Sequence, residues 1–241
     1  MAAEVSYNTA ELVCISSARL LEDGKVVFAG AGLPLLAAIL AQKTHAKGLT
    51  ILFEGGVIGP FVEPGKLPPS TNEQRCAAHA NMVLSTTDVL LLQQRGYVDY
   101  GFLGGAQVDQ YGNINSSFIG DWSKVIVAMH HEKRRLVKKV DFITSPGYLN
   151  GGDSRKQAGL IAGGALKVVT HLAILGFDDR KGVMCLEGLQ PGATVEKVQE
   201  NTGFPLMVKA ELYEASPPTE QELSILHVLD PERRYTTPRG E

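Results

Sequence analysis

Three short apolar segments of the sequence are each followed within two residues by glycine, and this arrangement constrains the fold more than any other feature. Each segment is rich in β-branched and aromatic residues, which favour strands, and glycine then permits a tight turn. Between the first two segments, residues 33–41 form an apolar run with Pro34 in its first turn, as expected of a buried helix. The segments and their glycines are residues 25–29 before Gly30 and Gly32, 50–53 before Gly55 and Gly56, and 100–103 before Gly104 and Gly105.

A strand, a helix and a second strand in this order predict an α/β fold in which helices flank an open, mostly parallel sheet. The 241 residues lie within the size range of one large α/β domain, so we expect a single domain over residues 1–241. Capping-box spacings mark further helix starts, and β-branched runs mark further strands. The additional helices are predicted to begin near residues 9, 70, 88, 194 and 219, and the additional strands lie at 125–129 and 141–144 and in a late antiparallel hairpin joining 168–177 to 183–186.

Charge, cysteine content and hydropathy exclude several classes of protein. Lys and Arg number 23 against 26 for Asp and Glu, and the resulting net charge of −3 argues against general nucleic-acid binding. Cys14, Cys76 and Cys185 are far apart, so neither a disulfide framework nor a thiolate metal site is expected. No apolar run reaches the roughly 20 residues that span a bilayer. We therefore expect a cytoplasmic protein with no membrane or nucleic-acid partner, which binds small molecules or other proteins.

Glu54 is the first candidate for a catalytic residue, because it follows an apolar strand and precedes two glycines. A carboxylate in this position can attack a thioester carbonyl while neighbouring backbone N–H groups stabilise the developing oxyanion. The same pattern also fits a solvated acid at the end of an edge strand. The residue pattern alone leaves both interpretations open.

The glycine turns themselves indicate a ligand site only in combination. In a parallel sheet all three turns would meet at the carboxyl edge, where ligands bind in this class of fold. Each turn taken alone is equally explained by loop closure. A dinucleotide fingerprint would require a third glycine where Leu35 stands, so a nicotinamide cofactor is not expected.

Two polar clusters farther along the chain have a structural and a functional interpretation. His130, His131 and Glu132 could suggest a metal site, but adjacent residues of a strand point to opposite faces, and we predict no metal. The basic residues between 133 and 139 fit either a solvated loop or contact with a phosphate-bearing ligand.

Several sequence motifs and their order along the chain resemble those of the β subunit of class I coenzyme A transferases, in particular the glutaconate type. The resemblance extends over residues 20–204. The matching segments are GAGLP at 30–34, FEGG at 53–56, GFLGGAQVD at 101–109, GNIN at 112–115, HEKRR at 131–135, TSPGYL at 144–149, LQPG at 189–192 and NTGF at 201–204.

This resemblance implies an active site shared with a homologous α subunit in a heterotetramer or a larger assembly. It implies that Glu54 is the nucleophile and that coenzyme A is a substrate and a covalent intermediate, with no tightly bound cofactor. The expected substrates are an acyl-CoA and a short dicarboxylate such as glutaconate. The residues expected to contact the substrate or its oxyanion are Gly104, Gly105, Ala106, Gln107, Gly30, Gly32 and Gly55, with residues 30–33 forming the adjoining wall of the pocket.

The sequence departs from the family pattern after residue 120. Relatives carry a glycine-rich loop before the strand that leads to HEKRR, whereas here Asp121 to Lys124 continues directly into Val125. The departure leaves two other interpretations open. One is a decarboxylase or hydrolase of dicarboxylic acyl-CoA on the same fold, and the other is a non-catalytic scaffold subunit. The presence of Glu54 favours the transferase.

Overall fold

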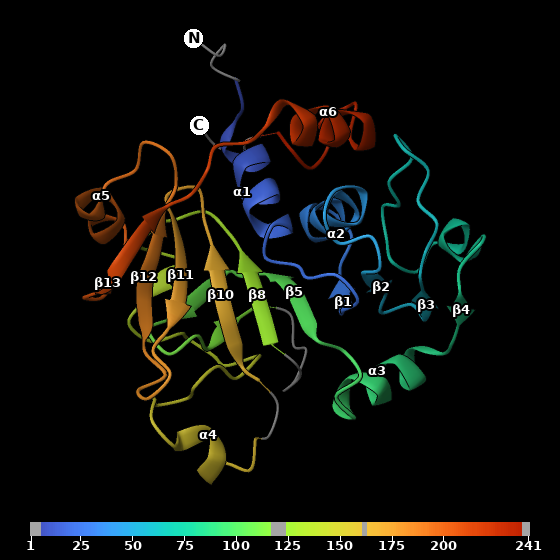
Figure 1. Ribbon diagram of the computed structural model, residues 1–241. Coiled ribbons are helices and arrows are strands. Elements are labelled where there is room, and N and C mark those ends of the chain that lie inside the picture. The colour runs from blue at the N-terminus through green and yellow to red at the C-terminus, as the bar shows by residue number, and fades with distance from the viewer. Residues whose placement is uncertain (1–5, 117–123, 161–162, 238–241) are drawn as a thin grey trace. The chain divides into compact units, whose positions relative to one another are not determined.

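The computed structural model describes residues 6–116, 124–160 and 163–237 (Figure 1). Its contacts divide the chain into two compact units. The first comprises Met1–Phe102 together with Pro218–Glu241, and the second comprises Leu103–Pro217. The expectation of one domain over residues 1–241 stays a prediction.

The sheet of the first unit is built around β1, which pairs in parallel with β2 and with β5. In the register of these strands, Phe28 lies level with Leu52 and with Gly101. Two short strands, β3 and β4, continue the sheet beyond β2 in antiparallel orientation. The strands are β1 (Val26–Ala29), β2 (Thr50–Leu52), β3 (Val57–Ile58), β4 (Met82–Val83) and β5 (Tyr100–Gly104).

Three helices of this unit, α1, α2 and α6, pack against one another although α6 comes from the C-terminal part of the chain (Figure 1). Capping boxes begin α1 at Asn8 and α6 at Thr219, as predicted, and Pro34 lies in the first turn of α2. The ion pair between Arg19 and Glu222, at 2.6 Å, links α1 to α6. The helices are α1 (Thr9–Ala18), α2 (Leu33–Lys43), the 3-10 helix η1 (Gln74–Ala77), α3 (Thr86–Gln94) and α6 (Glu220–Leu229).

The prediction that a helix begins near residue 70 is wrong. The Ser70 hydroxyl accepts a hydrogen bond from the backbone of Asn72, two residues on, and so forms a local turn instead of capping a helix. Only the short η1 follows, and its N-cap residue, Glu73, makes no side-chain capping bond. The sequence that resembles a capping box therefore serves as a turn.

The second unit contributes five strands to a larger mixed sheet and contains a smaller sheet of three strands. In the larger sheet β8 is parallel to β10 and β12 is parallel to β13, whereas β10, β11 and β12 are antiparallel neighbours. The smaller sheet has the order β7, β6, β9. The elements are β6 (Gln107–Asp109), β7 (Ile114–Asn115), β8 (Lys124–Ala128), β9 (Leu136–Val137), α4 (Ser154–Gln157), β10 (Ala165–Val169), β11 (Ala173–Phe177), β12 (Met184–Leu189), α5 (Val195–Glu200) and β13 (Met207–Glu214).

Two strand predictions in this unit need correction, and one strand was missed. Residues 168–177 form two strands, because Thr170 accepts bonds from the Leu172 and Ala173 N–H groups and closes a turn. Residues 141–144 are not a strand, and only an isolated bridge joins Ser145 to Ile114. The edge strand β13 was not predicted at all. The late hairpin itself is present as β11 and β12.

The fold class is confirmed: helices flank an open, mostly parallel sheet, with antiparallel strands added to it. Within the part of the chain that the structure describes, no helix is both long and apolar enough to cross a membrane.

Candidate functional site

Glu54 occupies the tip of the hairpin that joins β2 to β3. The Phe53 N–H donates to the Val57 carbonyl at 2.9 Å, and the Gly56 N–H donates to the Phe53 carbonyl at 3.0 Å, so the hairpin has a three-residue loop. Phe53 is fully buried, whereas the side chain of Glu54 is exposed. Among the described residues, the Glu54 carboxylate has no hydrogen bond and no ion pair. It is therefore available to react.

The loop also offers backbone donors. The N–H groups of Glu54 and Gly55 have no acceptor among the described residues. Free N–H groups beside a reacting carboxylate can stabilise an oxyanion. The predicted combination of a carboxylate and exposed backbone donors is therefore present in the hairpin loop.

The two glycines of this loop are required by packing. A Cβ atom at Gly55 would lie 2.6 Å from the Thr71 carbonyl oxygen and 2.3 Å from Oδ1 of Asn72. A Cβ atom at Gly56 would lie 1.9 Å from the Leu84 carbonyl oxygen, and the φ of Gly56 is +103°. Both positions therefore exclude any side chain.

Gly30 and Gly32 follow the neighbouring strand of the same unit. Since Phe28 pairs with Leu52, Gly30 and Glu54 each lie two residues beyond a paired position, at the carboxyl ends of adjacent parallel strands. The space around Gly30 is open, because a Cβ atom there would have no described atom within 4 Å, whereas Gly32 has a φ of +102° and packs against the ring of Tyr235. The structure thus brings Gly30, Gly32, Glu54 and Gly55 to one edge of this sheet.

The residues from Gly104 to Gln107 are held by contacts within the second unit. Gly105 is buried, and a Cβ atom there would lie 3.1 Å from the Val127 side chain. The Ala106 N–H donates to Asn115 at 3.1 Å. The side-chain oxygen of Gln107 accepts bonds from Asn115 and from the Asp141 N–H, and its amide nitrogen donates to Asp141 at 2.9 Å. These contacts give Gln107 a structural role, and its contact with a substrate stays a prediction.

One member of the basic run has a defined structural role that the sequence did not reveal. The Arg135 guanidinium donates to the Gly105 carbonyl at 3.2 Å and pairs with Glu132 at 3.2 Å. Arg134 also pairs with Glu132, at 2.6 Å. The hydrogen bond from Arg134 has the largest effect on the pKa of the Glu132 carboxyl and lowers it. Burial opposes this, but with the bond from Arg135 the pKa still lies below its usual range.

His131 is a buried core residue. Its ring nitrogens lie 2.9 Å from the Thr170 hydroxyl and 3.0 Å from the Thr202 hydroxyl. Burial, with a smaller effect of nearby His171, lowers the pKa of His131 to about 4. In the described part of the chain, no group of three or more His, Cys, Asp or Glu side chains is placed to hold a metal ion.

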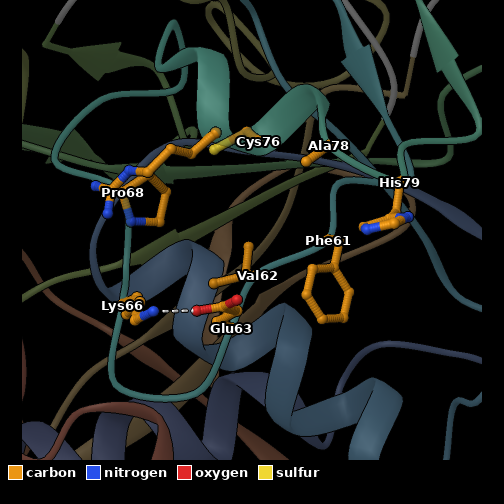
Figure 2. Close-up of a pocket in the computed structure, with 9 residues that line it drawn as sticks. Phe61, Val62, Glu63, Lys66, Pro68, Cys76, Ala78 and His79 are labelled. Carbon is orange, nitrogen blue, oxygen red and sulfur yellow. Dashed lines mark ion pairs between the residues drawn. The ribbon is translucent and has the colours of Figure 1, made fainter.

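A pocket of about 400 Å³ lies in the first unit between the loop after β3 and η1 (Figure 2). Phe61 and His79 meet edge to face at one side of it, with ring centroids 5.7 Å apart. Lys66 pairs with Glu63 at 2.5 Å, and Arg75 pairs with Glu73 at 2.6 Å. The two cations of the pocket are thus already neutralised. The proline-rich loop of residues 59–69 thus forms one wall of this pocket.

The departure from the family pattern at Asp121 to Lys124 falls almost entirely outside the described residues, because residues 117–123 are not among them.

Comparisons with known proteins agree on one family. A family model described as Coenzyme A transferase matches residues 15–124 and 122–201. The chain is 36% identical to the B subunit of 3-oxoadipate CoA-transferase from Pseudomonas knackmussii, over 93% of this chain and 94% of the relative. It is 33% identical to the B subunit of glutaconate CoA-transferase from Acidaminococcus fermentans, over 98% and 97%.

Solved structures show the same fold. The crystal structure of glutaconate coenzyme A-transferase from Acidaminococcus fermentans matches with a TM-score of 0.88 at 30% identity, covering 97% of this chain and 99% of that one. The decarboxylase AibA/AibB matches with a TM-score of 0.78 at 23% identity, covering 95% and 98%, and this likeness concerns the fold alone.

The packing of the hairpin loop predicts that Gly56→Ala unfolds much more easily than the wild type. The new Cβ atom must displace the Leu84 carbonyl and adopt a positive φ, so we expect a loss of about 3 kcal/mol or more in the free energy of unfolding. Gly30→Ala is the matched control, because its site is open and its φ is not positive, and it should lose less than about 1 kcal/mol. Urea titrations measure both, and equal losses would contradict the packing argument.

Burial of neutral His131 predicts a pH-dependent stability. The pKa of His131 is about 4 in the folded protein and near 6.5 in the unfolded chain. As the pH falls from 6.5 toward 4, the unfolded chain takes up a proton that the folded protein does not, so the free energy of unfolding decreases over this range. Between pH 7.5 and 5.0 this amounts to about 2 kcal/mol. His131→Gln should remove this component from urea titrations, whereas substitution of exposed His79 by Gln should retain it. Parallel pH profiles for wild type and His131→Gln would show that His131 is not the cause.

Proposed function

Because the chain belongs to the coenzyme A transferase family, we propose that it is the β subunit of a heteromeric CoA-transferase with Glu54 as the nucleophile. The observation that carries this proposal is the Glu54 carboxylate at the tip of a hairpin loop, which has no hydrogen bond or ion pair among the described residues. It lies beside the free N–H groups of Glu54 and Gly55. A structural acid at the end of an edge strand would not need the close-packed glycines that fix this loop. We further propose that the enzyme works in the cytoplasm and has no tightly bound cofactor.

In the proposed reaction, a Glu54 oxygen attacks the thioester carbon of the donor acyl-CoA. The carbon–sulfur bond breaks, the CoA thiolate leaves, and an acyl-glutamyl anhydride remains. The thiolate then attacks the glutamyl carbonyl, which releases the donor acid as a carboxylate and leaves a glutamyl-CoA thioester on Glu54. The acceptor carboxylate reverses these steps. Holding the reactants in one site converts slow attack in water into fast steps between oriented groups.

The free N–H groups of Glu54 and Gly55 support this chemistry because they can donate to oxygen atoms that become negative during the attack. Gly30 and Gly32 lie at the end of the adjacent strand and are proposed to form the wall of the pocket. The proposed contacts of Gly104, Gly105, Ala106 and Gln107 with the substrate rest on the family resemblance.

The proposed acceptor is a short dicarboxylate. The two curated relatives are named for 3-oxoadipate and for glutaconate, and both acids carry a carboxylate at each end of a short chain. Both relatives are also named as the B subunits of their enzymes, which supports a homologous α partner for this chain in a heterotetramer or a larger assembly. A decarboxylase is the less favoured alternative, because the free Glu54 carboxylate suits covalent transfer and the likeness to AibA/AibB extends to the fold alone.

The mechanism predicts that Glu54→Gln loses transfer activity and keeps its fold. The amide retains the shape of the side chain but is a poor nucleophile, so the rate should fall at least about 1000-fold. The exposed carboxylate has no contact to lose, so the melting temperature should stay within a few degrees. In the wild-type αβ complex, mass spectrometry after addition of donor acyl-CoA alone should find CoA on the peptide that bears Glu54.

Glu220→Gln, a change at another exposed glutamate of the first unit, is the matched control and should retain both the adduct and the activity. Thioester consumption without any adduct in the wild type would support the hydrolase or decarboxylase instead.

The proposal also predicts that the chain alone is inactive. Co-expression with its α subunit, followed by size-exclusion chromatography, should give a complex with equal numbers of both chains and with transferase activity. A stable homomer of this chain with full activity would refute the need for a partner.

When a panel of acceptor acids is assayed with this complex, dicarboxylates should be better acceptors than acetate and acetoacetate.

A further inference from the structure

Asn72 lies directly against the loop that carries the proposed nucleophile. A Cβ atom built on Gly55 would be 2.3 Å from Asn72 Oδ1 and 3.0 Å from Asn72 Cα. Gly55 is the residue after Glu54, and its N–H group is one of the two free donors of the loop. Asn72 thus packs against the residue that directly follows the proposed nucleophile.

The backbone around Asn72 is fixed, whereas its side-chain amide is not engaged. The Asn72 N–H donates to the Ser70 hydroxyl at 3.2 Å, and the Glu73 N–H donates to the Ser70 carbonyl at 3.3 Å. These bonds hold residues 70–73 in a tight turn. The side chain is exposed, and among the described residues its amide group has no hydrogen-bond partner. A held backbone with an unused amide suits a donor that binds a substrate.

We propose that Asn72 is a catalytic residue whose side-chain amide donates a hydrogen bond to the thioester oxygen during attack by Glu54. This inference rests on the proposed transferase function. Negative charge develops on that oxygen as the Glu54 oxygen bonds to the carbonyl carbon, and it disappears when the carbon–sulfur bond breaks and thiolate leaves. A neutral amide donor stabilises this charge without neutralising the Glu54 carboxylate, which a lysine or arginine in its place would do.

The hairpin provides its own control residue. Gly59, at the far end of β3 from the loop, packs against Asn81 in a similar way, because a Cβ atom on Gly59 would lie 2.6 Å from Asn81 Nδ2. Asn81 is also exposed, and its amide has no hydrogen-bond partner in the described ranges. Since β2 and β3 are antiparallel, Asn72 contacts the tip of the hairpin and Asn81 contacts its base. A purely structural role would be shared by both asparagines.

The test measures formation of the CoA adduct on Glu54 in the αβ complex after rapid mixing with donor acyl-CoA. Asn72→Ala should slow adduct formation roughly 10- to 100-fold and change the KM for the donor less than about threefold, because the lost bond acts in the transition state. Asn81→Ala should form the adduct at a rate within about threefold of the wild-type rate, because Asn81 is not expected to stabilise the transition state.

Asn72→Asp gives a second readout that packing alone would not change. It keeps the size of the side chain but places an acceptor-only anion beside Glu54 at neutral pH. The ratio of its rate to the wild-type rate should therefore rise as the pH falls from 7.5 to 5, because a growing fraction of the new carboxyl carries a proton that it can donate.

Two results would overturn the assignment of Asn72: a wild-type rate of adduct formation in Asn72→Ala, or equal losses in Asn72→Ala and Asn81→Ala. A pH-independent ratio for Asn72→Asp would also count against it. Failure of the wild-type complex to form any adduct overturns the proposed function itself, and this inference with it.

Discussion

The parallel pairing of β1 with β2 and β5 is the arrangement on which the rest of the first unit depends. Parallel strands end at the same edge, so residues that follow β1 and β2 in the sequence become neighbours in space. These strands are covered on both faces, because consecutive residues such as Val27 and Phe28 in β1 and Ile51 and Leu52 in β2 are all buried. Burial of these side chains therefore also determines where Glu54 stands.

The short motif Glu54-Gly55-Gly56 combines two separate requirements. The glycines are needed because the backbone at Thr71 and at Leu84 approaches the loop too closely for a side chain. The glutamate has no such packing role, since its side chain is exposed. A rigid loop that carries an unconstrained carboxylate suits a nucleophile, because packing fixes the backbone while the reactive group stays free.

Elements defined by local chemistry were predictable from the sequence. The capping boxes at Asn8 and Thr219 and the β-branched run before Gly30 appear in the structure as expected. Predictions were wrong where side chains bond to the nearby backbone, as Ser70 and Thr170 do, because such bonds form turns within segments whose pattern suggests a helix or a strand.

The candidate site was predictable to the same extent. Glu54 and its glycines were recognisable because they are adjacent in the chain, whereas the contact between Asn72 and Gly55 joins residues 17 positions apart through backbone packing that no local pattern records.

The division of the first unit between two parts of the chain affects the order in which the protein can form during translation. Helix α6, which packs on α1 and α2, is made only after all of Leu103–Pro217 has been synthesised. At typical elongation rates that interval is on the order of ten seconds. Throughout it, nascent α1 and α2 lack the cover that α6 provides, so chaperone binding on the ribosome should concentrate on their exposed apolar faces.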